Sequence, residues 1–90
     1  MSDADRQKVT RCFMDLIRQI RNKKDVLAEL YSRWILDEDK IEEIMSMKRR
    51  NDKVEAILKV VMSSGRKLSD FVDILELTGN GTAIRKLKET

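Results

Sequence analysis

The chain has 90 residues, 41% hydrophobic and 39% charged, with a formal net charge of +3, no Pro, no His, three Gly and one Cys. This length predicts a single domain over residues 1–90, and the composition is typical of an ordered, helix-rich protein rather than a disordered one. No apolar run is long enough to span a membrane, and one Cys excludes an internal disulfide, so a cytoplasmic protein is expected.

The first predicted helix covers about residues 4–21. Its apolar residues recur at the three- and four-residue spacing of one helical stripe, with Cys12 at the border. The residues of this stripe are Val9, Phe13, Leu16, Ile17 and Ile20. Arg11 and Arg18 fall on the opposite face, which is therefore expected to lie in solvent.

Two further helices are predicted over about residues 25–34 and 38–46, with Asp25 and Asp37 as their N-caps. The buried stripe expected in the first consists of Val26, Leu27, Leu30, Tyr31 and Trp34. The narrow apolar face expected in the second consists of Ile41, Ile44 and Met45. Between them, Ile35 and Leu36 form a short apolar joint that is expected to enter the core.

The last three helices are predicted at about residues 50–63, 66–78 and 81–88, each with one apolar face. Gly65 is expected to end the first in a left-handed conformation, and Gly79 is expected to end the second. The fold class is therefore all-α. Short connections favour antiparallel neighbours, so we expect a bundle of six helices around one core.

The charges are arranged along the chain in blocks of alternating sign. Residues 1–24 carry seven bases and three acids, residues 25–43 two bases and seven acids, and residues 44–67 seven bases and two acids. Like-sign blocks repel within one domain, but they become useful if a basic face of one molecule docks on an acidic face of the next. Such a contact is head-to-tail and can close into a ring or propagate as a filament.

No catalytic, metal or cofactor site is predicted, and an enzyme is the weakest of the functional classes. The chain lacks His, the commonest general base, and Cys12 is interpreted as a small buried residue. The acidic run that starts at Asp37 departs from a calcium loop at Lys40 and Ile41. The Gly-Asn-Gly at residues 79–81 lacks the Lys of a phosphate loop and is interpreted as a turn.

A small basic helical domain that binds nucleic acid is the alternative function. The helices have the size of a helix-turn-helix, but the acidic block would repel phosphate and few aromatic residues are free to stack on bases. A steep loss of affinity with salt would identify such a domain.

The order of these elements resembles that of a caspase recruitment domain (CARD) of the death-fold superfamily. The start resembles that of an initiator-caspase prodomain over DADRQKVTRCFMDLI. The next two helices and their apolar joint resemble the family pattern over VLAELYSRWILDEDKIEEI. The basic fourth helix and the Phe-bearing fifth are similar over RRNDKVEAILKVVMSSG and LSDFVDILELTGN. The sequence departs from the pattern at Trp34, at Glu55 and at Ser64-Gly65, where the family often has Arg-Gly.

The resemblance implies a six-helix antiparallel death fold of Greek-key type, with a bent first helix and no catalysis or cofactor in the domain itself. It implies binding to another CARD-containing protein, such as an adaptor, an apoptosome scaffold or a caspase, or self-association. The outcome would be recruitment or activation of a caspase in apoptotic or inflammatory signalling, including an inflammasome. Neither a small-molecule substrate nor a membrane takes part in this function.

The family contact pairs a basic face of the first and fourth helices with an acidic face of the second and third. The residues that the resemblance places on the basic face are Arg11, Arg18, Arg50 and Lys53. Those that it places on the acidic face are Glu29, Asp37, Asp39, Glu42 and Glu43. Reversing the charge of Arg50 or Glu42 is therefore expected to abolish partner binding without changing the fold.

Overall fold

Seven α-helices and no strand make up the computed structural model, which describes residues 1–90. The helices are α1 (Asp3–Arg11), α2 (Phe13–Gln19), α3 (Lys23–Ser32), α4 (Glu38–Met45), α5 (Arg50–Ser63), α6 (Leu68–Leu77) and α7 (Gly81–Glu89). The predicted all-α class is confirmed, whereas the count of six helices is wrong by one. None of the helices has the length and apolar character needed to cross a membrane.

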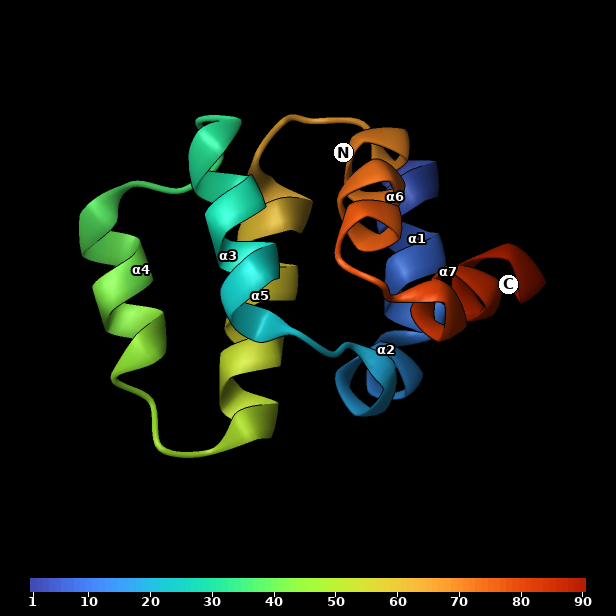
Figure 1. Ribbon diagram of the computed structural model, residues 1–90. Coiled ribbons are helices and arrows are strands. Elements are labelled where there is room, and N and C mark those ends of the chain that lie inside the picture. The colour runs from blue at the N-terminus through green and yellow to red at the C-terminus, as the bar shows by residue number, and fades with distance from the viewer.

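The helices divide into two groups in space (Figure 1). On one side α3, α4 and α5 lie next to one another, and the chain reverses direction from each to the next, so α4 forms an outer edge of the molecule. On the other side α6 lies near α1, while α2 and α7 pack against each other below them. The contacts of α2 with α5 and of α3 with α6 join the two groups around one core.

The extra helix arises because the first predicted helix is broken at Cys12. The backbone of Cys12 leaves the helical region (φ −110°, ψ 19°), and its thiol donates a hydrogen bond to the Lys8 carbonyl at 3.2 Å. A side chain that bonds the carbonyl four residues back bends a helix in the same way when it is Ser or Thr. The bend implied by the resemblance therefore occurs at Cys12, and it still leaves Val9 and Leu16 fully buried.

The core contains the apolar stripes that the spacing predicts in the second half of the chain. Helix α5 has the predicted range, and its stripe is buried at Val54, Ile57, Leu58 and Val61. Leu36 is buried as well, so the joint between α3 and α4 does enter the core. Gly65 and Gly79 have the left-handed φ angles expected of residues that end helices, +77° and +76°.

Helix α3 differs from its prediction at both ends. Asp25 does not cap it, because Asn22 adopts a left-handed conformation (φ 56°) and the helix begins at Lys23. The predicted burial of Tyr31 and Trp34 is also wrong: 45% of Tyr31 and 91% of Trp34 is exposed. Since α3 ends at Ser32, Trp34 lies beyond the last helical turn and no longer follows the buried stripe.

The end of helix α4 brings one further correction. Met45, which we expected on the apolar face with Ile41 and Ile44, is the last residue of the helix and is 50% exposed. Ile44 is fully buried, and Ile41 packs against the core while partly exposed. The apolar face of α4 is therefore narrower than its spacing predicts.

Two asparagines hold the two groups of helices together through the backbone. Asn80 is 2% exposed, its side-chain oxygen accepts the Arg21 N–H at 2.5 Å, and its side-chain NH₂ donates to the Arg21 carbonyl at 3.0 Å. Asn22 donates to the Thr78 carbonyl at 2.7 Å. These bonds pair the α2–α3 link with the α6–α7 turn, and they satisfy the polar groups of the buried Asn80 side chain.

Candidate protein-interaction faces

The lysines near the start of α3 and α5 surround one cavity of about 520 Å³. The cavity lies where α3 and α5 begin and α4 ends, and its lining is Asn22, Lys23, Lys24, Asp25, Leu27, Met45 and Lys53. Burial lowers the pKa of Lys23, and the positive charges of Arg50 and Lys53 lower it further. The cations at the starts of α3 and α5 are therefore close enough to repel one another.

Arg50 is the cation at this site whose side chain is held most firmly. Its guanidinium donates to the Ile17 carbonyl at 2.6 Å, to the Arg18 carbonyl at 3.3 Å and to the Ile20 carbonyl. These carbonyls lie at the C-terminus of α2, where a helix has unpaired acceptors and favours a positive charge. Arg50 thus joins α5 to α2, so reversing its charge would disturb the fold as well as the surface.

The structure brings three of the four predicted basic residues together. Arg18 is exposed next to Arg50 and forms a 3.9 Å ion pair with Asp15. Lys53 lies one turn after Arg50 on α5. Arg11 instead lines a separate depression along α1 with Asp3, Arg6, Gln7 and Thr10. The members of the basic end, as we name this surface, are Arg18, Lys23, Lys24, Arg50 and Lys53.

Lys23 and Lys24 were not among the predicted site residues. They belong to the basic run Arg-Asn-Lys-Lys at residues 21–24, and the predicted helices at about 4–21 and 25–34 leave both lysines in the connection between them. The left-handed turn at Asn22 starts α3 two residues earlier than predicted, and this places both lysines in its first turn.

The acidic residues belong to α4 and its N-cap, and α4 forms an outer edge of the molecule (Figure 1). Asp37 caps the helix as predicted, since its carboxylate accepts the Lys40 N–H at 2.8 Å. Asp37, Asp39 and Glu43 line one depression of about 360 Å³, and Glu43 forms a 3.0 Å ion pair with Lys40. The members of this acidic edge are Asp37, Glu38, Asp39, Glu42 and Glu43.

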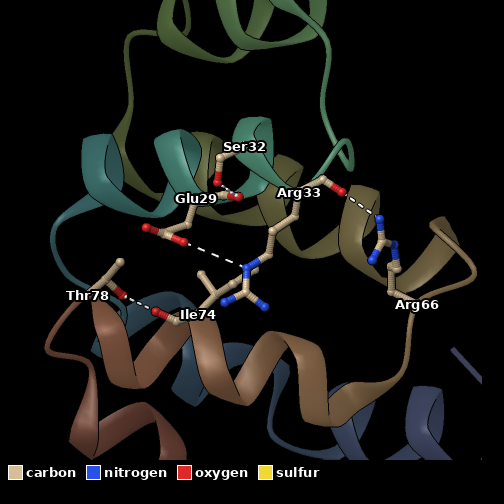
Figure 2. Close-up of polar contacts among 6 residues, drawn as sticks. All are labelled: Glu29, Ser32, Arg33, Arg66, Ile74 and Thr78. Atoms are coloured by element: carbon tan, nitrogen blue, oxygen red, sulfur yellow. Dashed lines mark hydrogen bonds and ion pairs between the residues drawn. The ribbon is translucent and has the colours of Figure 1, made fainter.

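Glu29, the remaining residue predicted on the acidic face, is engaged within α3. Its carboxylate pairs with the Arg33 guanidinium at 3.7 Å, as Figure 2 shows. From the α5–α6 loop, Arg66 donates to the Arg33 carbonyl at 2.5 Å. Glu29 therefore has less free charge to offer a partner than the exposed acids of α4.

Two aromatic residues at the corner between α3 and α4 were missed because the helical spacing assigned them to the core. Tyr31 donates from its hydroxyl to the Glu38 carboxylate at 3.1 Å, and this bond, followed by the negative charge of Glu38, raises the Tyr31 pKa. Trp34 lies three residues further on, at a position where the sequence departs from the family pattern. Exposed Trp and Tyr are the residues most enriched at energetically important interface positions.

Metal sites and reactive cysteines are two further kinds of site to consider in this structure. No group of three or more His, Cys, Asp and Glu side chains is placed to hold a metal ion. Cys12 is buried, and burial raises its pKa, so the thiol lacks the features of an activated nucleophile. The charged surfaces and the exposed aromatic residues are features typical of surfaces that recognise another macromolecule.

Comparison with known proteins gives one match. The family model described as caspase recruitment domain matches residues 6–81. No curated protein matches the chain, and no solved structure does.

Proposed function

Since the chain belongs to the caspase recruitment domain family, whose members are non-catalytic modules that bind their own kind in apoptotic and inflammatory signalling, we propose that it assembles with other such domains through the basic end and the acidic edge. A second copy of this chain is the partner to which its charges are complementary. The cellular outcome is recruitment or activation of a caspase in the cytoplasm.

The observation that supports this proposal most strongly is that no ion pair joins the basic end to the acidic edge within one molecule. All five ion pairs join residues that are only three or four positions apart in the chain. None of them joins the basic end to the acidic edge. Lys23, Lys24, Arg50 and Lys53 form no ion pair at all, although the charges of Arg50 and Lys53 repel that of Lys23.

A second molecule can relieve this repulsion by placing its acidic edge against the basic end of the first. Because the two surfaces lie at different places on the same chain, the contact is head-to-tail and leaves one surface free on each partner. Opposite charges also orient and accelerate the encounter, and salt screens them over about 8 Å at physiological ionic strength. Association is therefore expected to weaken as salt rises.

Charge reversal on each of the two surfaces tests the proposal. Lys53→Glu on the basic end and Glu42→Lys on the acidic edge should each weaken association at least tenfold, about 1.4 kcal/mol. Lys88→Glu on α7 is the matched control, since it makes the same change at an exposed site outside both surfaces. Sedimentation velocity measures association, and circular dichroism checks the fold. Assembly that survives both reversals would refute the proposed contact.

The nucleic-acid alternative gains no support from the position of the exposed aromatics. Tyr31 is bonded to Glu38 of the acidic edge, and Trp34 is close to it in sequence. Base stacking would have to occur next to carboxylates that repel phosphate, and the basic end has no exposed aromatic of its own.

A further inference from the structure

Trp34 has two features that are explained neither by packing in the core nor by the solubility of the protein. It is 91% exposed, and its backbone has a left-handed φ of 62°. For a bulky residue this backbone conformation is a genuine outlier, and such outliers concentrate at functional sites. The exposed indole therefore indicates a contact with another molecule.

The turn that carries Trp34 is fixed by hydrogen bonds to the end of α3. The Trp34 N–H donates to the Tyr31 carbonyl at 3.1 Å, and the Ile35 N–H donates to the Leu30 carbonyl at 2.9 Å. This pair of bonds is the Schellman helix end, in which the left-handed position is usually Gly. Glycine would make the same turn without strain, so the fold does not require tryptophan here.

The residues on both sides of Trp34 make the turn rigid. On one side Arg66 holds the Arg33 carbonyl (Figure 2), and the Arg33 guanidinium is itself paired with Glu29. On the other side Leu36 is buried in the core. An exposed aromatic on a fixed turn loses little conformational entropy when it binds, which is a property of interface anchors.

The opposite end of α3 carries the lysine-lined cavity. Its two hydrophobic lining residues are Leu27 and Met45, and Lys23, Lys24 and Lys53 supply positive charge. Its volume of about 520 Å³ is within the range of about 300–1,000 Å³ that is typical of pockets for drug-sized ligands, which is enough volume for an indole side chain. Met45, which is 50% exposed, offers a thioether to an aromatic ring.

We propose that Trp34 of one molecule inserts into the lysine-lined cavity of a second copy of this chain. This inference rests on the proposed function and adds the anchor and the pocket of that contact. The indole face attracts ammonium groups, and Met45 packs against its edge. Glu38, which Tyr31 holds at the same corner, brings a carboxylate toward the lysines of the other copy.

The two halves of this contact cannot meet within one molecule. Trp34 follows the last turn of α3 and the cavity lies at its first turn, and a ten-residue helix is about 15 Å long. Each copy therefore has one anchor and one empty partner site for the next copy. The contact is head-to-tail, in agreement with the unpaired charges of the basic end and the acidic edge.

Intrinsic fluorescence tests this directly, because Trp34 is the only tryptophan in the chain. As the protein is concentrated into the range where it assembles, emission should shift to the blue, since the indole leaves water. Met45→Ala and Lys24→Glu, both at exposed positions of the cavity, should reduce the shift and weaken association at least tenfold. Leu77→Ala, which removes an exposed apolar side chain of α6, is the matched control and should change neither.

Trp34→Gly separates binding from folding. It should raise the melting temperature by a few degrees, because the left-handed backbone suits Gly, and it should weaken association at least tenfold. Assembly with unchanged emission, or assembly by Trp34→Gly at wild-type strength, would overturn the anchor. Glu42→Lys still tests the charged contact in that case, because Glu42 lies on the acidic edge and does not line the cavity. A wild-type chain that stays monomeric would overturn both proposals.

Discussion

Replacing Arg50 with Ala should destabilise the fold, although an exposed charge on a binding face would be expected to tolerate this change. The guanidinium donates to the carbonyls of Ile17, Arg18 and Ile20 at the end of α2. Arg50→Ala removes all of these bonds and leaves partly buried acceptors without a partner.

The size of the effect follows from the kind of bond that is lost. A hydrogen bond to a charged group contributes about 1.5–3 kcal/mol, and a cation at a helix C-terminus contributes about 0.3–1 kcal/mol, rising to about 2 when partly buried. The bonds share one guanidinium and are not additive, so we expect a total loss of about 2–3 kcal/mol. For a domain of this size that is a fall of roughly 10 °C or more in melting temperature.

Thermal and urea unfolding followed by circular dichroism measure this loss. Lys53→Ala is the matched control, because Lys53 lies one turn later on α5 and forms no ion pair, so its free energy of unfolding should change by less than about 0.5 kcal/mol. Arg50→Lys keeps the charge without the planar fork and should fall between the two. Equal stability of Arg50→Ala and Lys53→Ala would refute the capping role.

Three further predictions concern buried or coupled groups. Asn80→Ala should lower the free energy of unfolding in urea by about 2–4 kcal/mol, because it leaves the N–H and the carbonyl of Arg21 unpaired. A loss below about 0.5 kcal/mol would show that these two bonds do not hold the α2–α3 link to the α6–α7 turn. Cys12 should react with iodoacetamide far more slowly in the native than in the unfolded protein. Equal rates of alkylation in the native and the unfolded protein would contradict the burial of Cys12. Burial also raises the pKa of Cys12, so the stability that its neutral thiol contributes is present below the unfolded pKa of about 8.5 and is lost as pH rises through the folded pKa. Glu38→Gln should lower the pKa of Tyr31 toward its ordinary value in an ultraviolet titration, and an unchanged curve would show that the two groups do not interact.

The elements that sequence reasoning predicted well are those whose determinants lie within a few residues. Helix α5 has its four-residue stripe and the left-handed Gly65 close behind it, so both its range and its buried face could be read directly. Asp37 caps α4 through a residue three positions away. Every residue that determines these features therefore lies within a few positions of the feature itself.

The features that were missed depend on partners far along the chain or on an unusual backbone. Asn80 bonds a residue 59 positions away, and Arg50 bonds carbonyls 30 to 33 positions away. Trp34 continues the helical spacing of α3, so nothing in the pattern indicates that the helix ends two residues earlier. The sequence is therefore least informative about hydrogen bonds between distant parts of the chain and about the left-handed turn at Trp34.

Mixing two variants that each lack one surface tests the head-to-tail account most directly. Lys23→Gln with Lys53→Gln weakens the basic end, and Asp39→Asn with Glu42→Gln weakens the acidic edge, in each case without introducing an opposite charge. Either variant alone should remain a monomer of about 10.5 kDa where the wild type assembles. Their mixture retains one intact surface of each kind, so light scattering should show a 1:1 dimer that grows no further. A mixture that stays monomeric, or a single variant that assembles like the wild type, would contradict the account.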